Sequence, residues 1–195
     1  MLLLHKPSAE EIAAFLARQG NSTYSYAPAG ATRDGFLAGR TVDHNRIQLG
    51  HGEHTFERPA AALRRWKMFD MPWLTLCWPD APIEAGVTVA IAVRIVGLWA
   101  LSACRIVYVI DEDTDARRYG FAYGTLTEHI ESGEERFLVE WRRADGTVWY
   151  DILACSRPHH PLARLGKPIA RMYQRRFARD SMRAMVWAVG PPAGP

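Results

Sequence analysis

The sequence lacks the features that would assign it at once to a secreted protein or to one of the common enzyme classes. Cysteine is scarce: Cys77, Cys104 and Cys155 all lie in apolar runs, without the spacing of a disulfide framework. Three such residues predict free thiols and a cytoplasmic location. P-loop, dinucleotide-binding, G-x-S-x-G and C-x-x-C motifs are all missing, and no cofactor is predicted.

Long hydrophobic runs and strong charge are also missing. The longest apolar stretch, 87–109, is interrupted by Arg94, Gly97 and Arg105, so it indicates a hairpin and no membrane span. The apolar triplet after Met1 is shorter than the core of a signal peptide. With a formal net charge of only +3, nucleic acid is not the expected partner. Nothing in the pattern indicates an oligomeric state.

What the chain does have is enough apolar material for one sizeable core, since 48% of its 195 residues are hydrophobic. Ser8 and Glu11 form a capping box that predicts a helix over 8–19. The Gly- and Ala-rich segment 21–39 is expected to be an ordered arm, pinned to the body by Tyr24, Tyr26 and Phe36. Domain boundaries are expected at 1–40 for helix and arm, 41–189 for the main domain and 190–195 for a flexible tail.

Alternation and turn signals predict a mainly antiparallel body followed by a long helix. A helix over 55–69 follows the first strand, and a helix begins at Pro168 and runs to about Ala188. The expected strands are 45–50, 73–78, 86–96, 99–111, 117–126, 134–142 and 147–157.

Several motifs resemble one family. They are NRIQLGHG (45–52), Leu63-Arg64-Arg65-Trp66, GFAYGTL (120–126), GEERF (133–137) and SRP with the following HPLARLG. They are similar to the DUF1990 (UPF0548-like) family of unknown function. The similarity extends from the arm to about Met185. The element order resembles the helix-grip fold of START-like and Bet v 1-like proteins. That resemblance implies an α+β fold whose curved antiparallel seven-stranded sheet wraps around a long C-terminal helix, with a cavity between them.

Strand 134–142 shows which face looks inward. Its odd positions, Glu135, Phe137, Val139 and Trp141, form the apolar set, so they are expected on the core face. A two-residue turn at Asp145-Gly146 would place Trp141 opposite Tyr150 and Glu135 opposite Ser156. On strand 117–126 the aromatic positions are expected inside and the small residues outside, unless a bulge shifts the register.

Glu135 is the candidate with chemistry. It is interpreted either as a polar anchor or general acid/base in the cavity, with Tyr123 as a second catalytic candidate, or as a strand-end carboxylate that meets solvent or Arg157. The aromatic set is either ligand-contacting or plain core. The candidate ligand-binding residues are Trp66, Tyr119, Phe121, Tyr123, Glu135, Phe137, Trp141, Tyr150, Ser156 and Met172.

Two other clusters have ordinary explanations. His51, Glu53, His54 and Glu57 sit at a helix start, where acidic residues suit the helix dipole, so no metal site is predicted. His159-His160 is expected to be a polar turn. The basic C-terminal helix is either an anion-binding patch or the solvated face of an amphipathic helix whose Ile169, Met172 and Tyr173 side contacts the sheet.

Three functions follow from this pattern. The first is a binding module that holds a small apolar or amphipathic molecule in the cavity. The alternative is a cyclase-, hydratase- or hydrolase-type enzyme that uses the same cavity. A second alternative is an interaction protein that uses the basic C-terminal helix.

Overall fold

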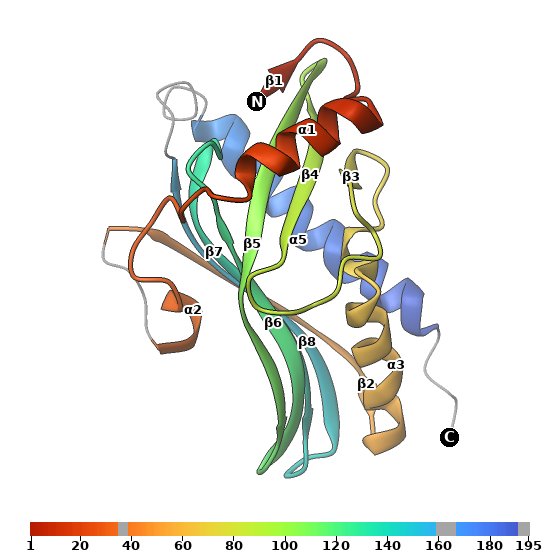
Figure 1. Cartoon of the computed structure of the whole chain (residues 1–195). Coiled ribbons are helices and arrows are strands. Elements are labelled where there is room, and N and C mark those ends of the chain that lie inside the picture. The colour runs from red at the N-terminus through yellow and green to blue at the C-terminus, as the bar shows by residue number, and fades with distance from the viewer. Residues whose placement is uncertain (35–38, 159–166, 191–195) are drawn as a thin grey trace.

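The computed structural model describes residues 1–34, 39–158 and 167–190. A strongly curved antiparallel sheet wraps around α5 (Lys167–Val189), and α3 (Glu53–Arg64) packs beside α5 at one end of the concave face (Figure 1). This arrangement confirms the expected helix-grip fold. The predicted Phe36 contact and the His159-His160 turn fall outside the described residues.

The elements follow in the predicted order, with a short strand and a one-turn helix that were not predicted. Before the sheet come β1 (Leu2–Leu3), α1 (Ala9–Gln19) and α2 (Ala31–Asp34). The 3₁₀ turn η1 (Lys67–Phe69) follows α3. The strands are β2 (Thr41–His51), β3 (Leu74–Leu76), β4 (Thr88–Ile95), β5 (Leu98–Asp113), β6 (Ala116–Thr125), β7 (Glu131–Arg142) and β8 (Thr147–Pro158).

The sheet has the order β2-β8-β7-β6-β5-β4-β3, so the seven predicted strands form one path, and β1 adds to β5. A bulge at Val107 in β5 adds one residue relative to β6. It switches the alternation: Cys104 and Ile106 face the concave core before it, whereas Tyr108 and Ile110 face outward after it. The bulge therefore lets β5 bend with the sheet and changes which residues of β5 face the concave core.

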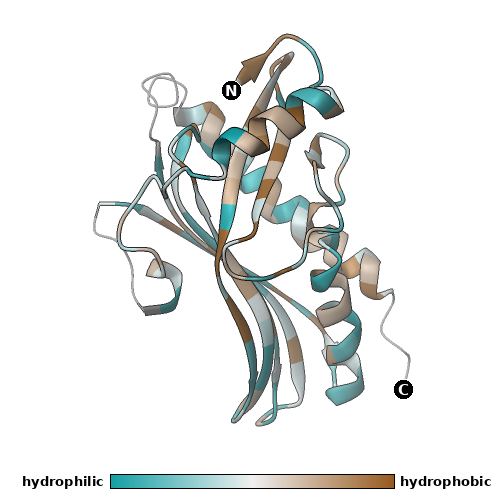
Figure 2. Cartoon of the chain, in the orientation of Figure 1, coloured by the Kyte–Doolittle hydropathy of each residue, from teal (hydrophilic) through white to brown (hydrophobic). Residues whose placement is uncertain are grey.

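The main core lies between the concave face and the two helices. Phe121, Phe137, Val139 and Tyr150 project from the sheet and are completely buried against side chains of α3, η1 and α5. Period-two alternation on the strands and an apolar stripe on the helices produce this layer. Figure 2 shows hydrophobic residues along β4 and β5, where α1 covers the outer face of the sheet.

Part of the convex face is covered by the N-terminal segment. The predicted capping box is present, with Glu11 N donating to Ser8 Oγ at 3.2 Å and Ser8 N donating to Glu11 Oε2 at 2.8 Å. Phe15 of α1 is buried on the outer side of β4 and β5. The arm then crosses β5, β6 and β7, and Tyr24 OH donates to the Ile106 carbonyl.

Three expectations need correction. The Asp145-Gly146 hairpin has a four-residue loop, 143–146, because Gly146 N donates to Arg142 O and Asp145 accepts from Thr147. Trp141 therefore pairs with Val148, and Glu135 pairs with Ala154 instead of Ser156. A shift of two residues leaves every side chain on its predicted face.

The helix expected over 55–69 is interrupted. α3 ends at Arg64, and Trp66 adopts a left-handed conformation at φ 55° before η1 begins. The break turns both Trp66 and Phe69 into the core, where Trp66 Nε1 donates to the Ala81 carbonyl at 2.8 Å.

The expected face of α5 is also wrong in part. Tyr173 turns inward and packs against Trp73, just before β3, but Met172 is 56% exposed and Ile169 is 46% exposed. The stripe that packs inward is instead formed by Phe177, Ala178, Ser181 and Met185. Both apolar patterns exist in the sequence, and the contact with α3 and η1 selects one of them.

Candidate functional site

A carboxyl and a phenol meet on the concave face, between the sheet and α5. Tyr123 on β6 and Glu135 on β7 are direct cross-strand neighbours, and Tyr123 OH donates to Glu135 Oε2 at 2.8 Å. Cross-strand pairs on one face lie close enough for such a bond. The structure thus confirms Glu135 on the core face and shows a tyrosine as its partner.

The surroundings of Glu135 disfavour its ionised form. Removal of the carboxyl from water raises its pKa to about 7; the Tyr123 hydrogen bond opposes this shift, and the nearby Glu131 and Asp43 add to it. No cation among the described residues forms an ion pair with it. Burial also raises the pKa of Tyr123 well above its ordinary value, so the phenol keeps its proton and remains a donor.

Glu135 is surrounded by protein, yet part of its surface stays accessible to solvent. The same is true of residues further along this end of the concave face, namely Glu131, Ser156 and Gln174. Gln174 Nε2 donates to Glu131 Oε2 at 2.6 Å and lies 3.4 Å from Ser156 Oγ. Partly exposed polar side chains therefore lie on the same side of the molecule as Glu135, along the first half of α5.

Aromatic rings fill the space beyond the carboxyl. The Phe137 ring lies 5.3 Å from Tyr123, 5.5 Å from Phe121, 5.7 Å from Phe69 and 6.2 Å from Phe177, measured between centroids. Edge-to-face and tilted contacts at these distances are typical of packed aromatic cores. The interior next to Glu135 is therefore occupied by side chains in this structure.

The predicted ligand-binding residues divide into three groups. Phe121, Tyr123, Glu135, Phe137 and Tyr150 come together on the concave face, and Tyr150 OH also bonds Ser181 Oγ of α5 at 2.9 Å. Ser156 lies toward the end of β8, within 3.4 Å of Gln174 Nε2.

The other four predicted residues do not contact Glu135, and their surroundings differ. Trp66 packs edge-on to Phe121 at 4.8 Å and belongs to the buried core. Tyr119 lies beneath the Arg64 guanidinium, and Trp141 is partly buried with its ring N–H unpartnered among the described residues. Met172 points away from the core, so it does not join the site.

Sequence reasoning missed Glu134, the neighbour of Glu135. It lies on the opposite, convex face and is only 2% exposed. It accepts hydrogen bonds from Tyr26 OH at 2.6 Å, Gly30 N at 2.8 Å and Thr32 N at 2.9 Å, and from the Thr32 hydroxyl. Because its partners lie about a hundred positions away in the arm, no local pattern could reveal it.

Glycine makes room for this arrangement. The Tyr26 ring lies directly over Gly124, where an added Cβ would come 2.8 Å from Tyr26 Cε1. The outer strip of small residues predicted on 117–126 is therefore present, and the arm covers part of it. Tyr26 and Tyr24 are the pins that the sequence indicated.

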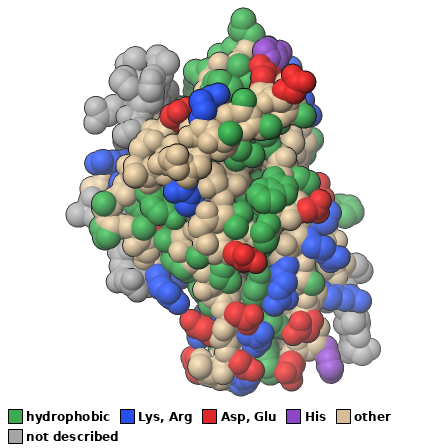
Figure 3. Space-filling view, viewed as in Figure 1, with side chains coloured by type: hydrophobic (Ala, Val, Ile, Leu, Met, Phe, Trp, Pro, Cys, Tyr) green, Lys and Arg blue, Asp and Glu red, His purple; other side chains and the backbone are tan. Residues whose placement is uncertain are grey.

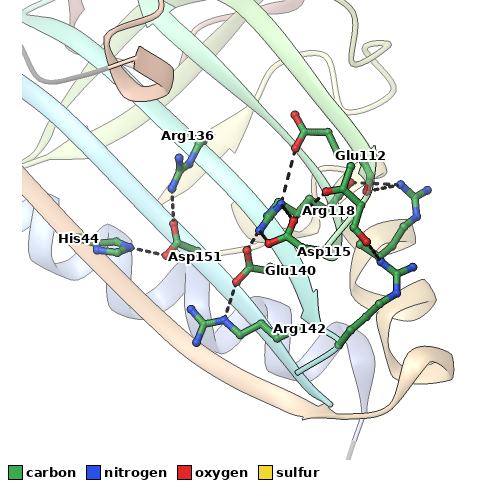
Figure 4. Close-up of polar contacts among 11 residues, drawn as sticks. His44, Glu112, Asp115, Arg118, Arg136, Glu140, Arg142 and Asp151 are labelled. Carbon is green, nitrogen blue, oxygen red and sulfur yellow. Dashed lines mark hydrogen bonds and ion pairs between the residues drawn. The ribbon is translucent and has the colours of Figure 1, made fainter. Parts of the chain in front are cut away.

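Other carboxylates on the convex face are paired with arginine. Figure 4 shows Asp151 between Arg136 and His44, and Glu140 between Arg118 and Arg142. These ladders cross neighbouring strands and stabilise the sheet surface. Glu135 has no such arginine partner among the described residues, in contrast to Glu140 on the same strand.

Among the residues that the structure describes, no three His, Cys, Asp or Glu side chains converge as a metal site would require. His51 instead contacts Gln48 at 2.7 Å. Cys77, Cys104 and Cys155 are all free thiols, as predicted. Within the described part of the chain, no helix combines the length and hydropathy needed to cross a bilayer.

The curved sheet around a C-terminal helix defines the class: a helix-grip protein with a polar pair at one end of an aromatic interior. Comparison of the sequence with known proteins shows its family. Residues 25–184 match the family described as "Domain of unknown function (DUF1990)". A UPF0548 protein of Dictyostelium discoideum is 36% identical, covering 97% of this chain and 96% of its own length. One from Deinococcus radiodurans is 39% identical, covering 97% and 100%. The chain belongs to this family.

Solved structures show only a general likeness. Ara h 8.0201 matches with a TM-score of 0.49 at 11% identity, over 77% of this chain and 98% of that one. Human STARD10 matches with a TM-score of 0.47 at 12% identity, over 95% of this chain and 80% of that one. The assignment to the helix-grip class therefore rests on the strand order and the central helix described above.

Proposed function

We propose that this protein binds a small amphipathic molecule on its concave face, with the polar end of the molecule at Glu135. The observation that carries this proposal is a carboxyl with a pKa of about 7 that is bonded to Tyr123 and lacks a cation partner among the described residues. A buried charge of that kind costs free energy unless something compensates it. A bound donor group would provide that compensation.

The position of the pair indicates the chemistry of the ligand. Glu131 and Asp43 add negative potential near Glu135, which disfavours a carboxylate or phosphate at this point. A hydroxyl, amide or amine would suit the site, because each donates to the free carboxyl oxygen. The aromatic rings beyond it favour an apolar or aromatic body for the rest of the molecule.

Entry requires movement of side chains from α5. Tyr173 and Phe177 line the accessible side and are only partly buried, whereas Phe121 and Phe137 on the sheet are completely buried. We expect the ligand to displace the first pair and to rest against the second. Aromatic rings on α5, which makes few contacts with the sheet, can shift more easily than rings on strands that are hydrogen-bonded on both sides.

The experiment compares amphipathic amines and alcohols with matched carboxylates, by thermal shift and native mass spectrometry on the whole chain. Binding of the donors, lost in Glu135→Gln and weakened in Tyr123→Phe, is the expected result. Glu112→Gln, an exposed carboxyl on β5, is the matched control and should bind normally. Equal binding by Glu135→Gln, or tighter binding of the carboxylates, would contradict the proposal.

One observation favours an enzymatic use of the same pair. A carboxyl that titrates near neutral pH can both accept and release a proton, which is what general acid/base catalysis of a hydration, cyclisation or hydrolysis requires. In that case Glu135 transfers the proton, and the hydrogen bond from Tyr123 holds the Glu135 carboxyl in position. Turnover of any bound compound should follow a pH profile with an inflection near 7 that Glu135→Gln abolishes. If compounds of the panel bind but none is converted, ligand binding without catalysis is the function.

A further inference from the structure

The side of α5 that faces away from the sheet carries arginine and exposed apolar residues together. We define the outer face of α5 by residues that are all exposed and recur at helical spacing. They are Ile169, Met172, Arg175, Arg179, Arg183, Val186 and Trp187. Trp187 is 85% exposed, which is unusual for so large an apolar ring.

The charge on this helix is mostly positive. Its sequence holds six Lys and Arg residues but a single acid, Asp180. Asp180 is already engaged, since Trp73 Nε1 donates to it at 2.9 Å and Arg176 and Arg179 pair with it. Arg175 forms no ion pair with any described residue, and Arg183 only approaches Asp180 at 3.8 Å. The outer face thus stays positive.

The positive surface continues around the C-terminal end of the helix. A groove of about 540 Å³ lies between η1 and α5, and its lining includes Trp187, the cations Arg65, Lys67 and Arg183, and the two acids Asp70 and Asp180. Figure 3 shows Lys and Arg side chains gathered at the right edge of the molecule, over α3 and the C-terminal half of α5.

We infer that the outer face of α5 docks on an anionic lipid surface, with the helix lying in the plane of the interface. Ile169 and Trp187 are eighteen residues apart, or about 27 Å along a helix, with the arginines between them. Arginine in the centre attracts phosphate headgroups, while the apolar ends enter the headgroup boundary. This inference does not depend on ligand binding at Glu135.

The apolar ends decide between a lipid surface and a nucleic acid. Contacts to a phosphate backbone need the arginines but have no use for Ile169, Met172, Val186 and Trp187. Tryptophan, by contrast, prefers the boundary between lipid and water. Exposed rings and arginines on one stripe therefore fit a lipid surface better than nucleic acid.

The test is sedimentation of the full chain with vesicles of phosphatidylcholine alone and with added phosphatidylserine, at low and physiological salt. We expect binding only to the phosphatidylserine vesicles, weaker at the higher salt. Arg175→Gln with Arg179→Gln should lower the partition coefficient about 25-fold, since each basic residue near such a surface contributes about fivefold. Arg18→Gln with Arg94→Gln, exposed arginines on α1 and β4, is the matched control and should bind as the wild type does.

Trp187→Ala separates the lipid surface from other anions. It should reduce vesicle binding, whereas Trp78→Ala, which removes an exposed tryptophan outside α5, should not. Lipids brominated near the headgroup should quench tryptophan emission in the wild type and not in Trp187→Ala. All of these side chains are exposed, so thermal melts should confirm that the variants fold.

Three outcomes would overturn the inference. The first is no binding to phosphatidylserine vesicles at low salt. The second is an equal loss of vesicle binding in the Arg18 and Arg94 control variant. The third is binding to a mixed-sequence RNA that is stronger than vesicle binding and is unchanged by Trp187→Ala.

Discussion

Glu134 and Glu135 are neighbours on β7 with the same side chain and opposite surroundings. Glu134 faces the convex side, where Tyr26, Gly30 and Thr32 of the arm surround it with donors. Glu135 faces the concave side, where Tyr123 is its one hydrogen-bond donor among the described residues. The first carboxylate is saturated by the protein, whereas the second has acceptor capacity left over.

The difference shows that two buried carboxyl groups on one strand can have opposite surroundings. Glu134 is the more deeply buried residue, but its donors come from the chain itself, so it ties the arm to the sheet. Glu135 keeps a raised pKa and some solvent access, and these two properties support the ligand-binding role proposed for it. Substitutions of Glu134, Gly124, Glu135 and Tyr123 test this contrast.

Glu134→Ala should destabilise the fold most, by about 3–5 kcal/mol, because it leaves several buried donors in the arm without an acceptor. Urea unfolding measures the loss, and hydrogen exchange should show rapid opening of residues 24–34. Thr127→Ala, an exposed site near the end of β6, serves as the control. Unchanged exchange in the arm would mean that Glu134 does not hold it.

Gly124→Ala should cost about 1–3 kcal/mol, because the new methyl group would overlap the Tyr26 ring and push it from Glu134. A double-mutant cycle tests this reason. In a Tyr26→Ala background the same substitution should cost much less, and strictly additive effects would show that the strain arises elsewhere.

Glu135→Gln should change how stability depends on pH. The pKa of Glu135 is about 7 in the folded protein against an ordinary value of 4.5. Between these values only the folded state keeps the proton, so stability falls as pH rises from about 4.5 to 7 and levels off above. The wild type should lose up to about 3 kcal/mol relative to the variant across that window. Parallel stability curves for the two proteins would contradict the raised pKa.

Tyr123→Phe should have the smallest effect on stability, about 1 kcal/mol, since it removes one hydrogen bond and keeps the ring. Its informative consequence is electrostatic. The Tyr123 bond favours the ionised carboxyl, so its loss should raise the pKa of Glu135 further, which carbon NMR of the labelled carboxyl measures. A lower pKa in the variant would show that the phenol is not the partner.

Much of the fold could be predicted from local pattern. Period-two alternation on 134–142 placed Glu135, Phe137 and Val139 on the core face, and the capping box marked the start of α1. These features depend on neighbours within a few positions, which a sequence displays directly. The motifs added the family, which the comparison with its members confirms.

Long-range contacts decided the rest. The hairpin loop of 143–146 set the pairing of β7 with β8, and packing against α3 and η1 chose which of two apolar stripes on α5 turned inward. The arm buried Glu134 and left Glu135 to the concave face. A carboxylate's surroundings depend on chain segments far away in sequence, so alternation could assign each residue a face but not its partners.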